Sequence, residues 1–236
     1  MLRVDFVTLF PEMVMHAVSD SIMARAVKSG AVKFGTSNPR EFTVDAHRSV
    51  DDTGYGGGPG MVMMAPPIAA ALDALSPSPE AEIVLCDASG ERFGQEAARR
   101  LSTTPHVVFL CGHYGGVDER VRTKLATCAY SIGDYVVTGG ELPALVMADA
   151  VVRLLPGVLG DPASRKADSH SEGLLGYPLY TRPDEFMGEG VPDVLKSGNH
   201  AEIERWRRKQ QVQRTRSNRP DLFCRAGLSL GDLDLI

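Results

Sequence analysis

Glycine-rich stretches hold the residues whose types and spacing favour ligand binding. The first, Gly54–Gly60, has five glycines in seven positions and follows Asp51 and Asp52. Glycine lets a backbone approach a ligand or another backbone closely, so a ligand loop and a tight packing turn both fit this composition. No helix directly follows the glycines and no Gly-Lys-Ser or Gly-Lys-Thr closes the stretch, which argues against dinucleotide and Walker phosphate loops.

Two further stretches follow apolar runs that are typical of buried strands. In Cys111–Arg120 a glycine turn leads into an acidic helix start, a pattern suited to the adenosine or ribose of a cofactor. Asp118 and Glu119 also suit a helix N-terminus electrostatically. In Ser131–Pro143 an apolar loop offers backbone N–H and C=O groups to a flat heterocycle between aliphatic walls.

Strand and helix patterns alternate along the first two thirds of the chain. Apolar runs predict strands at Leu2–Leu9, Glu82–Cys86, His106–Cys111 and Ala129–Ile132. Helical patterns predict helices at Pro11–Val27, Pro66–Leu75, Gly94–Leu101, Asp118–Ala126 and Glu141–Leu155. The alternation predicts an α/β domain with a mostly parallel sheet, whose ligand site lies on loops beyond the carboxyl ends of the strands.

The character of the sequence changes after Leu159. Residues 161–173 lack periodic apolar positions and are rich in small polar side chains, so we predict a mobile linker between a domain at 1–160 and another at 174–236. The C-terminal part has a helical pattern and is too small for a large core of its own. It is therefore expected to pack on something else, such as a second copy of the chain.

The overall net charge of −5 hides one basic segment. Lys196–Pro220 holds eight basic residues against Glu202 and Glu204, and it includes the only tryptophan, Trp206. A basic segment on an acidic chain is typical of a face that meets a polyanion, and an aromatic ring there can stack on a base. A solvated helix and a core tryptophan are the alternatives that composition leaves open.

Composition and length exclude several classes of protein. A chain of 236 residues that is 43% hydrophobic and 23% charged is typical of a folded protein of one or two domains. The most apolar stretch, Leu142–Gly160, is interrupted by Asp149 and Arg153, and the N-terminus lacks a basic leader, so we predict neither a membrane span nor a signal peptide. Four cysteines without a CxxC pair argue against a zinc site and favour a cytoplasmic protein.

Sequence blocks running in order from Met1 to about Pro220 resemble the bacterial tRNA (guanine-N1)-methyltransferase family. They are MLRVDFVTLFPEM, VDDTGYGGGPGMVM, CGHYGGVDERV, SIGDYVVTGGELPAL, RLLPGVLG, ADSHSEGLL, YTRP and NHAEIERWRRKQ. The resemblance implies a trefoil-knotted SPOUT-type α/β domain, a small helical C-terminal domain and an obligate homodimer with its active site at the subunit interface. It also implies S-adenosylmethionine as methyl donor and, as acceptor, N1 of the guanine immediately 3′ of the anticodon in tRNA. The expected nucleic-acid partner is thus a tRNA anticodon stem-loop and not DNA.

The resemblance assigns roles to residues at matching positions. Asp168 matches the aspartate that similar enzymes use as the base for the N1 proton, and Arg153 is the candidate for contacting guanine O6 or a nearby phosphate. The residues implied to hold the donor are Leu85, Cys86, Gly112, Tyr114, Ser131, Ile132, Gly133, Asp134, Tyr135, Val136, Val137, Gly139, Gly140 and Pro143. The residues implied to contact tRNA are His47, Asp51, Ser169, Arg207 and Arg214. A base on a mobile linker predicts an ordering step, in which arrival of tRNA places Asp168.

Two stretches depart from the family pattern. Gly112-His-Tyr-Gly-Gly116 stands where the family usually has Gly-Arg-Tyr-Glu-Gly, so a carboxylate is missing at position 115 and a role for magnesium stays open. Cys86-Asp-Ala-Ser-Gly90 stands where the family usually has Leu-Ser-Pro-Gln-Gly, which favours backbone contacts with the donor there.

Other functions fit part of the same evidence. A related knotted methyltransferase could act on another RNA base or on a ribose, and a non-enzymatic RNA-binding dimer could have lost its affinity for the donor. A dinucleotide oxidoreductase is disfavoured because no acidic residue follows a proper fingerprint on a strand.

Overall fold

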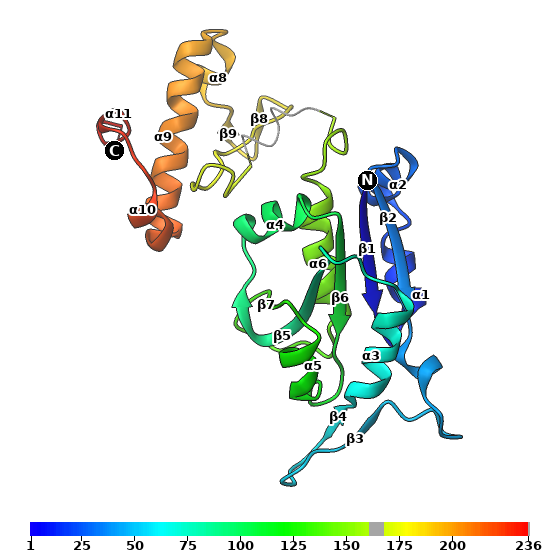
Figure 1. Cartoon of the computed structure of the whole chain (residues 1–236). Coiled ribbons are helices and arrows are strands. Elements are labelled where there is room, and N and C mark those ends of the chain that lie inside the picture. Colours follow the sequence, from blue (N-terminus) through cyan, green and yellow to red (C-terminus); the bar gives the residue numbers. More distant parts are fainter. Residues whose placement is uncertain (161–167, 236) are drawn as a thin grey trace. The chain divides into compact units, whose positions relative to one another are not determined.

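A computed structural model describes residues 1–160 and 168–235 of the chain. The chain divides into two compact units, Met1–Gly160 and Asp161–Ile236, drawn in Figure 1. Residues 161–167 of the predicted linker lie outside the described residues. Within the described ranges, no helix combines the length and the apolar character that crossing a bilayer requires.

The first unit is built on a five-stranded sheet. Its strands are β1 (Leu2–Val7), β2 (Val32–Ser37), β5 (Glu82–Arg92), β6 (His106–Cys111) and β7 (Cys128–Ser131). They lie in the order β2-β1-β6-β5-β7, and each neighbouring pair is parallel. The predicted α/β fold class with a parallel sheet is therefore confirmed. The trefoil knot that the resemblance implies stays a prediction.

Helices cover both faces of this sheet. One face packs against α1 (Pro11–Ala17), α2 (Ser21–Lys28), α4 (Gln95–Ser102) and α6 (Glu141–Val152). The other face packs against α3 (Ala65–Ala74) and α5 (Glu119–Lys124). Successive side chains of a strand point to opposite faces, so Phe6 and Val7 of β1 belong to different apolar clusters.

The single helix predicted over Pro11–Val27 is wrong, because the chain forms two helices there. The amide and the hydroxyl of Ser19 both donate to the carbonyl oxygen of His16 and close the first helix. Asp20 then adopts an extended conformation, with φ −121° and ψ 166°, before α2 begins at Ser21. Local hydrogen bonding by serine competes with the helix here, as it does at many helix ends.

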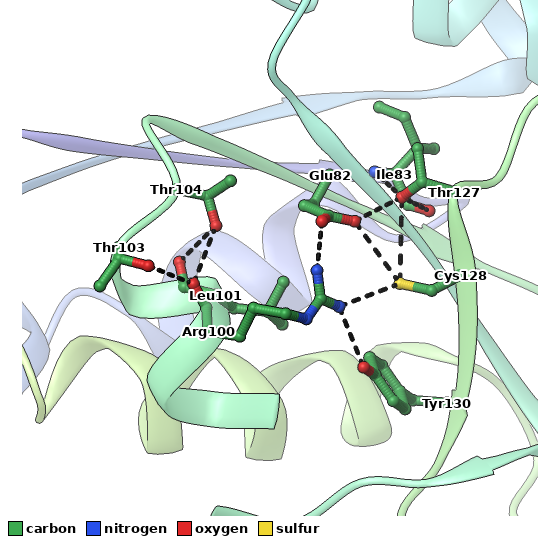
Figure 2. Close-up of polar contacts among 9 residues, drawn as sticks. All are labelled: Glu82, Ile83, Arg100, Leu101, Thr103, Thr104, Thr127, Cys128 and Tyr130. Atoms are coloured by element: carbon green, nitrogen blue, oxygen red, sulfur yellow. Dashed lines mark hydrogen bonds and ion pairs between the residues drawn. The ribbon is translucent and has the colours of Figure 1, made fainter. Parts of the chain in front are cut away.

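A polar cluster fastens α4 to β7, at one edge of the sheet, and to its neighbour β5 (Figure 2). The guanidinium of Arg100 forms an ion pair with Glu82 of β5 and donates to the hydroxyl of Tyr130 on β7 at 3.0 Å. Thr127 donates to the second carboxylate oxygen of Glu82 at 2.6 Å. The hydrogen bond to Tyr130 and the charge of Glu82 raise the pKa of Arg100, so the Arg100 guanidinium stays protonated.

The glycine stretch forms the tip of a hairpin that projects from the first unit in Figure 1. The hairpin pairs β3 (Asp51–Thr53) with β4 (Met61–Met63) in antiparallel register. Gly56, Gly57, Gly58 and Gly60 have φ between +75° and +118°, and a Cβ added at any of them would meet nothing within 4 Å. Within the described chain these glycines are needed for backbone conformation rather than for close approach.

The second unit is mainly helical. It contains α8 (Asp193–Lys196), α9 (His200–Asn218), α10 (Pro220–Arg225), α11 (Leu230–Leu233) and a two-stranded hairpin of β8 (Glu185–Phe186) and β9 (Glu189–Gly190). Arg208 of α9 makes two hydrogen bonds, of 2.6 and 2.9 Å, to the carboxylate of Asp232. This carboxylate also accepts from the amide of Ser229, the N-cap residue of α11. The predicted division into a domain at 1–160 and a helical domain at 174–236 stays a prediction.

Candidate functional site

A cavity of about 390 Å³ lies at the carboxyl ends of β5, β6 and β7. Three segments form its walls: the part of β5 where its pairing with β6 ends, the turn after β6, and the end of β7 with the loop that follows it. The lining residues are Leu85–Ser89, Gly112–Val117, Tyr130–Ile132, Tyr135–Gly140 and Pro143. Loops at the carboxyl ends of parallel strands are the usual place for ligands in α/β proteins, and the volume is in the range of small-molecule sites.

The first wall is an outward excursion of β5. The register of β5 with β7 shifts between Cys86 and Glu91, so the residues between them leave the ladder. Arg122 of α5 donates to the hydroxyl of Ser89 at 2.8 Å and holds this excursion. A Cβ at Gly90 would lie 2.6 to 2.7 Å from the backbone of Ala129 and Tyr130, so the return to β7 requires glycine.

The second wall is the turn after β6. The amide of Gly115 donates to the carbonyl oxygen of Met61 at 2.8 Å, and a Cβ at Gly115 would lie 2.9 Å from that oxygen. The turn is tight, because Tyr114 with φ 62° and Gly116 with φ 117° both have positive φ. Glycine adopts such a conformation at position 116 without strain. Position 115, where the family usually has an acid, is therefore packed against the β4 backbone.

The third wall is the loop between β7 and α6. The hydroxyl of Ser131 donates to the carbonyl oxygen of Gly133 at 2.9 Å and folds the start of this loop. At its end, the amide of Gly140 donates to the carbonyl oxygen of Gly112 at 2.8 Å. This backbone hydrogen bond joins the second and third walls.

Two buried thiols and one buried carboxylate lie at or next to lining residues in the sequence: Cys86 lines the cavity, Cys111 precedes Gly112 and Glu141 follows Gly140. Cys86 and Cys111 are register neighbours on β5 and β6. A hydrogen bond with Cys86, burial and the nearby charge of Glu141 raise the pKa of Cys111 well above its ordinary value. The Cys111 thiol therefore stays protonated at neutral pH. Glu141, the first residue of α6, is buried and accepts hydrogen bonds from Thr8 and His113.

The structure brings together most of the residues that the resemblance assigned to the donor. Those that line the cavity are Leu85, Cys86, Gly112, Tyr114, Ser131, Ile132, Tyr135, Val136, Val137, Gly139, Gly140 and Pro143. Gly133 and Asp134 are not among its lining residues. The cavity also contains residues that were not predicted, including His113 and Thr138. Each stands between two predicted residues in the sequence, which is the signal that could have found it.

The other predicted residues of the first unit lie away from the cavity lining. Arg153 is half-buried and forms the C-cap of α6. His47 is exposed in a turn where the Asp45 carboxylate accepts from the amides of His47 and Ser49 and from the Ser49 hydroxyl. These bonds lower the pKa of Asp45. Asp51 begins β3 and pairs with Met63 of β4.

The predicted base and the predicted tRNA contacts of the second unit lie on two segments. Asp168 is half-buried, and the Ser169 hydroxyl accepts from the amide of Gly176 at 2.8 Å. On α9, Arg207 pairs with Glu204 at 2.6 Å and its guanidinium lies 5.0 Å from the ring centre of Tyr177.

Arg214 and Trp206 differ in their surroundings on the same helix. The Arg214 side chain is exposed and donates to the carbonyl oxygen of Gly176 at 3.4 Å. Trp206 is half-buried, with its ring centre 6.3 Å from that of Tyr180, and it lines a shallow hollow of about 300 Å³ with Arg205 and Lys209. Arg214 is thus more accessible to a polyanion than Arg207.

No group of three or more His, Cys, Asp and Glu side chains suited to a metal ion occurs in residues 1–160 and 168–235. Among the lining residues of the cavity, the side chains of these types are Cys86, Asp87 and His113, which do not form such a group.

Comparison with known proteins identifies the relatives of this chain. A family model described as tRNA (Guanine-1)-methyltransferase TrmD matches residues 2–225. A Staphylococcus aureus (strain MRSA252) protein named tRNA (guanine-N(1)-)-methyltransferase is 48% identical over 235 residues, which cover 100% of this chain and 96% of the relative. A Moorella thermoacetica protein of the same name is 51% identical over 234 residues, which cover 98% and 94% of the two chains.

Proposed function

The chain belongs to the tRNA (guanine-1)-methyltransferase family, and on that premise we propose that it transfers a methyl group from S-adenosylmethionine to N1 of the guanine immediately 3′ of the anticodon in tRNA. The observation that carries the proposal is the cavity at the carboxyl ends of β5, β6 and β7, where most of the predicted donor residues meet. In this proposal the first unit binds the donor and the second unit binds tRNA.

The cavity suits a donor that carries a flat base and several polar groups. Ile132, Val136 and Val137 supply aliphatic surface, while Gly112, Gly139 and Gly140 bring backbone close to the cavity without side chains. When bound, S-adenosylmethionine supplies an activated methyl group on a sulfonium sulfur. The task left to the protein is to position the two reactants and to move one proton.

Asp168 is the proposed base of the reaction. Guanine N1 carries a proton and its lone pair is delocalised, so N1 needs a base to become a nucleophile at neutral pH. As the bond from sulfur to the methyl carbon breaks and the bond from N1 to that carbon forms, Asp168 accepts the N1 proton and S-adenosylhomocysteine leaves as a neutral thioether. Arg153 is the proposed donor to O6, where negative charge develops.

Exposed apolar side chains support the proposal of a homodimer. Leu142 and Val146 of α6 are 49% and 53% exposed, although α6 is otherwise a core helix. Phe10 and Met13 at the neighbouring α1 are 49% and 43% exposed. A helix that is apolar all round and a contiguous apolar patch both indicate a protein interface. A second copy would cover this patch and bring further residues to the active site.

Helix α9 supports binding of the anticodon stem-loop. It presents basic side chains that include Arg205, Lys209, Arg214 and Arg216, all exposed. Neither Arg205 nor Lys209 has a carboxylate partner within 4 Å among the described residues. Contacts between such cations and phosphates give an affinity that falls with salt.

The proposal is tested by incubating the protein with unmodified tRNA and methyl-labelled S-adenosylmethionine, followed by nucleoside analysis. The expected product is 1-methylguanosine, and a transcript with adenine in place of that guanine should gain no label. A label on a ribose or on another base would instead support a related methyltransferase. Absence of transfer with intact tRNA binding would support a non-enzymatic RNA-binding protein.

A further inference from the structure

The carboxylate of Glu141 is buried directly after the lining residue Gly140, and each of its oxygens has a hydrogen-bond partner. Its side chain is 3% exposed. The Thr8 hydroxyl donates to Oε1 at 2.7 Å, and His113 Nε2 lies 2.6 Å from Oε2. A buried carboxylate is costly unless such bonds compensate it, so removing either partner leaves Glu141 in an unfavourable state.

These partners come from three separate segments. Thr8 follows β1, His113 belongs to the turn after β6, and Glu141 begins α6 directly after the third wall. Phe10 adds to the arrangement, because its amide donates to the Thr8 hydroxyl at 2.9 Å and its ring centre lies 5.0 Å from that of His113. The bond from His113 to Glu141 is therefore a side-chain connection between the second and third walls.

Gly139 covers this connection. It forms an isolated antiparallel bridge with His113. A Cβ at Gly139 would lie 2.2 Å from His113 Nε2 and 2.7 Å from Glu141 Oε2. Only glycine leaves room for the loop to lie over the bond, and the Glu141 side chain is buried there.

From this geometry we propose that His113 and Glu141 are positioning residues, which act as a clasp that sets the spacing of the second and third walls and thereby the affinity for the donor. The inference rests on the proposed function, because it takes the cavity as the donor site. The clasp acts through the walls and leaves the binding of tRNA unaffected.

Strand β6, which precedes the turn of His113, also carries a second buried histidine that contacts a carboxylate. Neither residue of this pair lines the cavity. At the amino end of β6, His106 Nε2 lies 2.8 Å from Asp5 Oδ2, and both side chains are buried. A Cβ at Gly35 would lie 2.4 Å from Asp5 Oδ1, so this pair is also covered by a glycine. His106 and Asp5 thus provide a control with a buried histidine–carboxylate bond at the other end of β6, where Asp5 Oδ2 also pairs with Arg3 at 2.6 Å.

The test measures the affinity for S-adenosylmethionine by calorimetry, the affinity for tRNA by filter binding, and the thermal midpoint. His113→Ala should weaken donor binding about tenfold or more, because it leaves Oε2 of the buried Glu141 carboxylate without a hydrogen-bond donor and removes the side-chain link between the two walls. His113→Gln, which keeps an N–H group for the carboxylate, should restore most of the affinity. The affinity for tRNA should stay within about twofold of the wild type. His106→Ala should lower the thermal midpoint and leave donor affinity unchanged.

A double-mutant cycle separates a clasp from independent contacts. Gly139→Ala should also weaken donor binding, and its effect should not add to that of His113→Ala, because both changes break one connection. Wild-type donor affinity in His113→Ala, equal losses in His106→Ala, or additive effects would each overturn the inference. A wild-type protein that binds no S-adenosylmethionine would instead overturn the proposed function, and this inference with it.

Discussion

The amide of Gly140 donates to the carbonyl oxygen of Gly112, with 2.8 Å between nitrogen and oxygen. Gly140 has φ −76°, which any residue adopts, so its need for glycine is one of space. A Cβ at position 140 would lie 2.7 Å from the Cα of Cys111 and 2.8 Å from the nitrogen of Gly112. Two of the three cavity walls are therefore joined backbone to backbone, and α6 begins at the point of contact.

Replacing Asp168 by alanine should abolish turnover and spare donor binding. A lost general base typically costs about 100-fold to 10,000-fold in rate. Single-turnover methyl transfer measures the rate, and calorimetry measures the affinity for S-adenosylmethionine. Glu172→Ala is the matched control, since Glu172 is an exposed acid of the same segment. Normal turnover by Asp168→Ala would remove this residue from the mechanism.

Replacing Arg214 by alanine should weaken binding of tRNA and leave the affinity for the donor unchanged. The Arg214 side chain is exposed on α9. Loss of one phosphate contact should reduce the slope of log affinity against log salt by about 1. Filter binding across a salt series measures this slope. Arg25→Ala, an exposed cation of α2, should change neither quantity. An unchanged salt slope in Arg214→Ala would show that Arg214 makes no phosphate contact.

The second unit should lose stability in acid through Asp232. Hydrogen bonds from Arg208 and Ser229 hold the pKa of Asp232 well below its ordinary value. A lowered folded pKa means that the carboxylate stabilises the unit above its ordinary pKa of about 4, and that this contribution is lost as pH falls further. Asp232→Asn should cost about 1 to 2 kcal/mol at neutral pH and flatten the acid dependence.

Thermal unfolding followed by circular dichroism from about pH 7 to about pH 2 measures this effect. The control is Asp221→Asn, which removes a second Arg–Asp pair on the same unit. Arg219 holds the pKa of Asp221 at about 2, but the Asp221 side chain is 48% exposed, so solvent screening reduces its contribution. Equal effects of the two substitutions would contradict the role given to Asp232.

The buried strands were predictable from the sequence because they are apolar on both faces. The predicted strand His106–Cys111 coincides with β6, in which all six residues are buried. Strand β2 was not predicted, since its sequence VKFGTS is only partly apolar. Gly35 interrupts the pattern because a Cβ there would meet the carboxylate of Asp5, a requirement that only the folded sheet reveals.

The candidate site was predictable in part for a similar reason. Glycines at strand ends indicate loops that carry ligands, and the resemblance adds the identity of the donor. The pair of His113 and Glu141 could not be found in this way, because 28 positions separate the two residues and neither has a diagnostic neighbour. Only the return of the chain from β7 to the end of β6 brings them together.

The central claim is that the cavity holds the methyl donor, and calorimetric titration with S-adenosylmethionine tests it most directly. The wild type should bind the donor, and Gly140→Ala should bind it about tenfold more weakly or worse, because the new Cβ pushes the third wall away from the second. Gly94→Ala is the control, since nothing lies within 4 Å of a Cβ at that position. Equal affinity in the wild type and Gly140→Ala, or no binding by the wild type, would contradict the account.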